Sequence, residues 1–119
     1  MIAATDLKNA LAQHYGSQTI FKHSINPRFF YTEGVQCFAE EAGAYWFLDI
    51  VATDIWEFCL SLDFASVVLA VGESGGAAIG VEDGDGGVLW RKGIAYTDCP
   101  EGEWIFFYQN STLLLPLEY

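Results

Sequence analysis

The hydrophobic pattern of this 119-residue chain changes its period near Ala65. Before that point apolar residues recur at helical spacing, and after it they gather in short runs rich in β-branched and aromatic residues. These runs read "SVVLAVG", "AAIGVED", "GVLWRKGIAY", "EWIFFYQ" and "TLLLPLEY". Because the turn-forming strings between them are of hairpin length, the runs should pair as antiparallel neighbours. The sequence therefore predicts an α+β fold in which N-terminal helices pack on a C-terminal antiparallel β-meander of about five strands.

The predicted sheet needs cover on more than one side. Several of its runs are continuously apolar rather than alternating, which is typical of strands buried on both faces. We expect the helices to cover one face and a partner subunit to cover the other. The length of the chain is typical of one domain, so residues 1–119 are expected to form a single domain.

Capping signals divide the first half of the chain into three helices. The first covers "AATDLKNALAQHYG", with Thr5 or Asp6 as its cap and Gly16 as its end, and a short strand in "SQTIFKHS" comes after it. Thr32 is expected to cap a second helix, which ends at Gly43. A third and longer helix is predicted over residues 44–62.

The third helix carries an acidic stripe with three exceptions. Its acidic residues project to the face opposite a broad apolar face, as expected for a helix that packs on a core. Trp46, Ile50 and Leu60 lie among the acids. They indicate either a second covering element or an exposed contact patch. We favour cover, supplied by the preceding helix or by residues 17–30.

Negative charge is concentrated in the middle of the chain. The formal net charge is −11, and residues 33–63 contain seven acids and no lysine or arginine. Such a surface repels phosphate backbones and anionic lipid, so direct binding to nucleic acid or membrane is disfavoured. No apolar stretch approaches the roughly 20 residues that span a bilayer, and no secretory signal is seen. The sequence predicts a cytoplasmic protein whose acidic surface either binds a basic partner or keeps the chain soluble.

Motifs that could hold a metal or a phosphate are incomplete. In "VEDGDGGV", Asp83 and Asp85 fit the first two ligand places of a calcium loop, but the later positions lack the required glycine and glutamate. A hairpin turn with Gly84 and Gly86 at positive φ explains this string better. "GESGGAAIG" lacks the lysine of a phosphate-binding loop and precedes a strand, so it is also interpreted as a turn.

The histidines and cysteines also give no indication of a metal or disulfide site. His14 and His23 do not have metal-ligand spacing, and the three cysteines, Cys37, Cys59 and Cys99, are far apart. We interpret the cysteines as small core residues and expect no disulfide, metal or cofactor. Since no recognisable catalytic set is present, the sequence favours a protein that is not an enzyme.

Four blocks together resemble a small family of unknown function found in bacteria and mobile elements. They are "YTEGVQCFAEEAGAYWFLDIVA", "EDGDGG", "YTDCP" and the final "LLLPLEY", and the resemblance covers about residues 18–119. Cys99 stands where an aromatic residue is usual, and Asp85 where the turn often has asparagine. The resemblance supports the predicted fold and implies no activity.

Two functional hypotheses remain open. The first is a non-enzymatic acidic interaction protein that forms a homodimer or binds a basic protein partner. The alternative is a small enzyme or small-molecule-binding protein with a pocket between helices and sheet. The candidate binding residues are Tyr31, Tyr45, Trp46, Asp49, Ile50 and Glu57.

Overall fold

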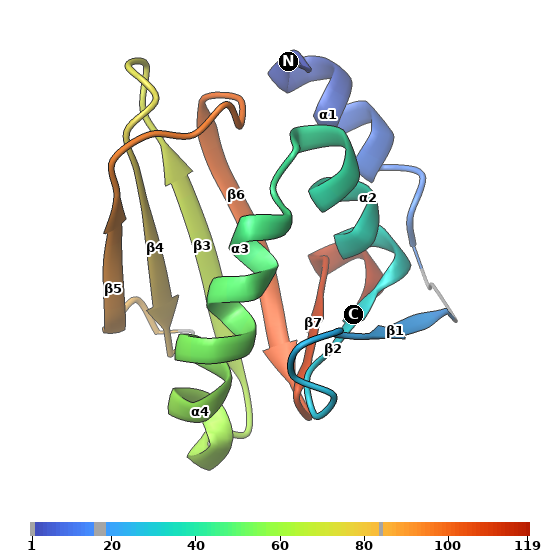
Figure 1. The fold of residues 1–119 in the computed structure, drawn as a ribbon, viewed down its shortest axis with the longest axis vertical. Helices are drawn as coiled ribbons and strands as arrows, with labels where there is room; N and C mark the ends of the chain where they lie inside the picture. Colours follow the sequence, from blue (N-terminus) through green and yellow to red (C-terminus); the bar gives the residue numbers. More distant parts are fainter. Residues whose placement is uncertain (1, 16–18, 84) are drawn as a thin grey trace.

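The computed structural model describes residues 2–15, 19–83 and 85–119, and its centre is a seven-stranded sheet (Figure 1). The strand order is β1-β2-β7-β6-β3-β4-β5. The strands are β1 (Ile20–Lys22), β2 (Phe30–Thr32), β3 (Ala65–Val71), β4 (Ala77–Glu82), β5 (Val88–Ile94), β6 (Gly102–Gln109) and β7 (Thr112–Leu114). The helices are α1 (Ala4–Leu11), α2 (Glu33–Ala42), α3 (Tyr45–Ile50) and α4 (Trp56–Phe58). The predicted α+β class is confirmed.

The predicted meander of about five antiparallel strands is wrong in its details. Only β3, β4 and β5 form a meander, because β6 returns across residues 95–101 and pairs with β3 instead of β5. The sheet is mixed, since β2 runs parallel to β7. The helices also do not simply precede the strands, because β1 and β2 lie between α1 and α2. The predicted strand in "SQTIFKHS" corresponds to β1, whereas no strand is predicted at β2.

The helices lie on one face of the sheet (Figure 1). Along β3, the inward residues Ala65, Val67, Leu69 and Val71 are buried and the residues between them are only half-buried. On the opposite face Phe107 of β6 packs against Phe64 and Tyr119, but within the described residues no helix or strand covers the outward side of β3 and β4. That face tolerates exposure because much of it is small, with Ala70, Ala78 and Gly80 at outward positions.

The core is centred on three aromatic rings from three different elements. Phe106 of β6 lies 4.9 Å from Phe38 of α2 and 5.0 Å from Phe47 of α3, measured between ring centroids. All three side chains are fully buried or nearly so. Such T-shaped and tilted arrangements are favourable for aromatic pairs beyond the area that they bury. This cluster fixes the helices on the sheet.

The capping predictions are right for α2 and wrong for α1. The Thr32 hydroxyl accepts a hydrogen bond from the Val35 N–H at 3.4 Å, and Gly43 ends α2 at φ 62°, a left-handed conformation that glycine adopts freely. In contrast, α1 begins at Ala4 after Ala3 without a side-chain cap. Thr5 and Asp6 therefore lie inside its first turn, and the predicted stop at Gly16 lies outside the described residues.

The third helix has the predicted extent but not a regular form. Helical structure runs through residues 45–61, yet Val51–Ile55 form a π-helical turn and Cys59–Ser61 a 3-10 turn. A π turn holds one extra residue and rotates the faces of the helix beyond it. With this rotation, Val51, Ile55 and Cys59 all remain buried.

Two tight turns shape the C-terminal half. Between β4 and β5, the Asp83 carboxylate accepts hydrogen bonds from the Asp85 and Gly87 N–H groups, and Gly86 has φ 90°. This confirms the predicted hairpin, although Gly84 lies outside the described residues. Between β6 and β7, Asn110 and Ser111 both have positive φ, as in a two-residue hairpin loop. Across residues 2–15, 19–83 and 85–119, the helices are too short or too polar to cross a membrane.

Candidate functional site

Three of the six predicted binding residues come together around the start of α3. Tyr31 on β2 is half-buried, and burial followed by the charge of Asp49 raises its pKa. The Tyr45 hydroxyl donates to the Glu40 carboxylate at 2.8 Å, and this hydrogen bond raises the pKa of Tyr45 to about 12. Both phenols therefore stay protonated at neutral pH, and the Tyr45 hydroxyl donates its proton to a hydrogen bond.

A histidine that the sequence did not single out as a binding residue completes this group. His23 is 5% exposed, and its Nε2 lies 2.9 Å from the Asp49 carboxylate. Its Nδ1 accepts hydrogen bonds from the Ile25 and Asn26 N–H groups at 3.2 and 3.1 Å. Because Nδ1 is an acceptor, the proton is assigned to Nε2, which donates to Asp49.

The His23–Asp49 pair holds the loop after β1 in place and does not present a base to a substrate. Both imidazole nitrogens are already hydrogen-bonded, and the Asn26 side-chain amide also donates to the Ala52 carbonyl at 2.8 Å. These contacts tie the turn after β1 to the helical segment. The sequence contains no local signal for them, since 26 positions separate His23 from Asp49.

The remaining predicted residues lie apart from this group. Trp46 and Ile50 are half-buried and precede Asp54 at four-residue steps, and Asp54 accepts a hydrogen bond from Lys92 of β5 at 3.1 Å. This side of the helix therefore faces β5, whereas residues 23–26 contact its other side. Leu60 is 60% exposed and Glu57 is exposed, so that end of the helix has the character of an open surface.

A second cluster joins two segments that are far apart in the sequence. The Glu118 carboxylate accepts hydrogen bonds from the Thr32 hydroxyl at 2.6 Å, the Gly34 N–H at 3.0 Å and the Leu115 N–H at 2.9 Å. A carboxylate at the N-terminus of a helix satisfies free N–H groups and complements the helix dipole. Glu118, in the short 3-10 turn η3 (Pro116–Glu118), therefore caps α2 together with Thr32.

Gly34 makes this contact possible. A Cβ atom built at Gly34 would lie 2.5 Å from the Glu118 Oε1 atom and 2.6 Å from a methyl group of Leu115. Neither distance is compatible with ordinary packing, so the close approach of the two segments requires a glycine here. The first and last of the four sequence blocks thus meet at one structural contact.

The cysteines are not activated nucleophiles. Burial raises the pKa values of Cys59 and Cys99 to about 11. The pKa of the half-buried Cys37 is also raised, first by burial and then by the charges of Glu41, Glu118 and Glu33. A thiol with a raised pKa has little of the reactive thiolate at neutral pH.

We therefore expect slow thiol chemistry in the folded protein. At pH 7.5, iodoacetamide should modify Cys37 more slowly than a free cysteine, and Cys59 and Cys99 should react only when the chain is unfolded in denaturant. Mass spectrometry of the alkylated protein measures this. Rapid modification of Cys59 or Cys99 in the folded state would contradict the burial of these side chains.

Comparisons with known proteins identify a family but no activity. Among the described residues, no group of three or more His, Cys, Asp and Glu side chains is arranged to hold a metal ion. Comparison with curated proteins and with solved structures finds no match. A family model described as "Family of unknown function (DUF6876)" matches residues 5–119, nearly the whole chain. The chain therefore belongs to this family of unknown function.

Proposed function

We propose that the chain is a non-enzymatic interaction protein whose acidic helix-side surface binds a basic protein partner. The observation that carries this proposal is the exposure of every acid in residues 33–63: Glu33, Glu40, Glu41, Asp49, Asp54, Glu57 and Asp63. In the described part of the chain, only Asp54 of this set pairs with a lysine. Asp49 pairs with His23, which is uncharged in the assigned tautomer. The surface thus keeps a largely uncompensated negative charge.

The electrostatic field of such a negatively charged surface favours a partner of opposite charge. Concentrated charge of one sign steers a complementary protein toward its site and raises the association rate by factors of about 10–1,000 at low salt. Salt screens such attraction over about 8–10 Å at physiological ionic strength. The proposal therefore predicts a partner whose binding weakens strongly as salt is added.

Two charge-matched variants test the proposal. The first carries Glu41→Gln, Glu57→Gln and Asp63→Asn on the helix side, and the control carries Glu73→Gln, Asp85→Asn and Glu101→Gln on exposed loops. Each removes three negative charges, so both have the same net charge. A partner captured from cell lysate should be retained by the parent protein and by the control, lost by the helix-side variant, and released at high salt. Equal loss of the partner by both variants would show a response to net charge alone, and full retention by both would show that these helix-side acids do not bind the partner; either result would contradict the proposal.

Self-association through the uncovered sheet face is a second candidate. The small outward residues Ala70, Ala78 and Gly80 form a shallow floor, with Arg91 of β5 on one side and Glu103 of β6 on the other. If two copies packed face to face about a twofold axis parallel to the strands, Arg91 of each would approach Glu103 of the other. Light scattering after size-exclusion chromatography tests this, and Ala78→Arg should convert a dimer to a monomer. A monomer at all concentrations would exclude it.

A further inference from the structure

The N-terminal half of β6 has a free edge. β3 pairs with β6 over residues 102–108, but β7 pairs only with Phe107, Tyr108 and Gln109. Residues 102–106 therefore have a neighbouring strand on one side only. This edge is separate from the acidic helix-side surface, so a ligand bound here is independent of the proposed function.

The backbone groups of two residues point out of this edge. In a two-residue hairpin the residues that flank the loop, here Gln109 and Thr112, exchange both hydrogen bonds, and the pattern then alternates along the strand. By this alternation Phe107 also bonds to β7, and Ile105 and Glu103 direct their N–H and C=O groups toward the same side, beyond the end of β7. These groups are free to bond an added strand.

The chain itself does not extend β7 along this edge. Pro116 would come opposite Ile105, and proline has no N–H to donate. Leu115, opposite Phe106, directs its N–H away from β6 by the same alternation, and this N–H bonds to the Glu118 carboxylate at 2.9 Å. After Leu115 the chain turns away into η3. The edge is therefore left open because Pro116 cannot bond to it and the chain turns into η3, whose Glu118 caps α2.

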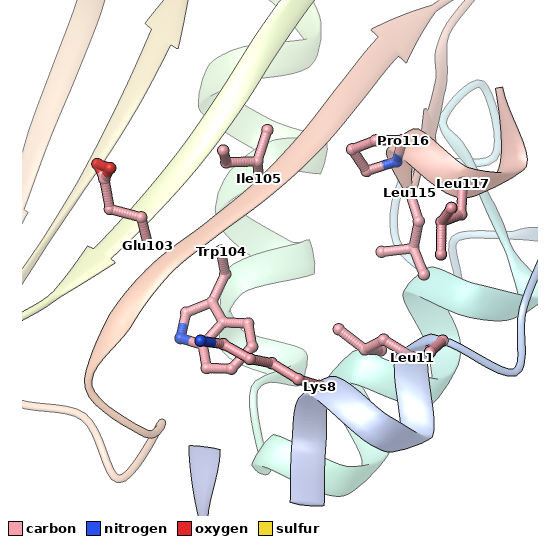
Figure 2. A pocket seen from close by; sticks show the side chains of 9 residues that line it. Lys8, Leu11, Glu103, Trp104, Ile105, Leu115, Pro116 and Leu117 are labelled. Atoms are coloured by element: carbon pink, nitrogen blue, oxygen red, sulfur yellow. The ribbon is translucent and has the colours of Figure 1, made fainter. Parts of the chain in front are cut away.

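An apolar groove of about 270 Å³ lies along this edge. Figure 2 shows Trp104 and Ile105 of β6 on one side, Lys8 and Leu11 of α1 below, and Leu115, Pro116 and Leu117 opposite. Trp104 and Leu115 are buried, whereas Ile105 and Leu117 are 47% and 60% exposed. The Glu103 side chain points away from the groove (Figure 2). A free strand edge thus lies at the side of an apolar hollow.

The other two sheet edges carry features that discourage strand addition. β5 contains Arg91 and Lys92 and a break in its pairing register, and β1 is three residues long and ends in Lys22. Charged residues, bulges and short edge strands are the usual protections of natural sheets. The open part of β6 has no lysine or arginine and lies along the groove, and its one charged side chain, Glu103, points away from the groove.

One charged group of the groove indicates the chemistry of its occupant. The Lys8 ammonium lies 5.9 Å from the centroid of the Trp104 ring. Of the two ion pairs in the described part of the chain, neither includes Lys8. A carboxylate on the occupant would pair with this cation.

We propose that the groove between α1, β6 and η3 binds an extended peptide segment of a partner protein, which adds to the free edge of β6 as a strand. Its backbone bonds to Glu103 and Ile105. Of its side chains at alternate positions on the helix side, most are apolar and one is a carboxylate that meets Lys8. Addition of a strand to a free edge gives affinity through the main chain and specificity through alternate side chains.

The probe is the synthetic peptide acetyl-Thr-Val-Thr-Val-Thr-Glu-Thr-amide, titrated into the isotope-labelled protein. Binding should be saturable below about 1 mM, the weak end of the affinity range for a short peptide. The amide signals of Glu103 and Ile105 should shift, and their hydrogen exchange should slow by about tenfold or more, since they become hydrogen-bonded. A peptide with its second threonine and its central valine both replaced by proline should not bind, because one of these two adjacent N–H groups points toward β6 in either strand orientation.

Matched variants locate the site. Ala12→Trp fills the groove from α1 and should weaken binding by about tenfold or more, whereas Gln13→Trp, one position away and outside the groove, should leave binding within about twofold. Ile105→Pro removes an edge N–H and should also weaken binding about tenfold, while Ile105→Ala retains that N–H and should bind within about threefold. Lys8→Ala and the peptide with glutamine in place of glutamate should each weaken binding, with no further loss when combined.

Several results would overturn the proposal. These are the absence of binding to the parent protein at 1 mM peptide, equal binding by Ala12→Trp and Gln13→Trp, and slowed exchange at Leu89 or Arg91 of β5 instead of Ile105. If the Ile105 amide exchanges slowly in the absence of peptide, and exchanges more slowly still as the protein concentration rises, a second copy of the chain occupies the edge. That result would also overturn the assignment to a partner peptide.

Discussion

Replacing Phe106 with alanine is expected to lower the free energy of unfolding by about 3–5 kcal/mol, the usual cost of removing a buried phenylalanine side chain. Phe106 is 1% exposed, and its ring contacts Phe38 and Phe47 at centroid distances of 4.9 and 5.0 Å. The substitution leaves a cavity where β6, α2 and α3 meet, and these elements cannot close it without moving the sheet and helices together. Chemical denaturation followed by circular dichroism measures the loss.

The adjacent residue provides the control. Ile105 lies on the same strand but points to the opposite side and is 47% exposed. Ile105→Ala should therefore cost less than about 1 kcal/mol. Comparable losses for the two substitutions would contradict the inward placement of Phe106 and, with it, the register of β6 on β3.

Glu118→Ala is expected to cost about 2–4 kcal/mol, because hydrogen bonds to a charged group contribute about 1.5–3 kcal/mol each and three of them share this one partly exposed carboxylate. The substitution leaves the Thr32 hydroxyl and the Gly34 and Leu115 N–H groups without their acceptor. Glu118→Gln keeps one carbonyl oxygen and should lie between Glu118→Ala and the parent. Glu73→Ala, an exposed loop position, should be nearly neutral.

A double-mutant cycle separates this contact from general helix effects. Alanine normally favours a helix over glycine by about 1 kcal/mol, but Gly34→Ala should destabilise because its Cβ collides with Glu118 and Leu115. In the Glu118→Ala background part of the collision disappears, so Gly34→Ala should cost less there. Additive effects would show that the two residues do not meet as the structure places them.

Local chemistry explains what could be predicted about the fold. The cap at Thr32 and the stop at Gly43 depend on atoms within a few residues, and both predictions are confirmed. β2 is not predictable from local sequence because it is only three residues long and its pairing with β7 joins Phe30 to Thr112. The position of β6 beside β3 is equally non-local. No property of residues 95–101 by themselves indicates that they carry the chain across the sheet.

The candidate site also combines local features, which the sequence predicts, with long-range contacts, which it does not. Tyr31, Tyr45 and Asp49 are predicted from the sequence and lie together, but the histidine that bonds to Asp49 lies 26 positions before it in the chain. Asp49 is exposed as expected for an acid on the outer side of a helix, yet it also holds His23. In "EWIFFYQ" every second residue faces inward, and the apolar run gives no indication of which residues these are.

The hydrogen bonds of Glu118 join the C-terminal end of the chain to the start of α2, and they should therefore form late in folding. The hydrogen bond from Thr32 to Glu118 spans 86 positions, whereas β3, β4 and β5 pair through short hairpins. Contacts of such separation form late, because the entropy of closing a long loop opposes them. β7 and η3 are thus the segment expected to dock last and to detach first during native fluctuations. While they are detached, the free edge of β6 extends along the whole strand, so a peptide that adds there competes with the protein's own last strand.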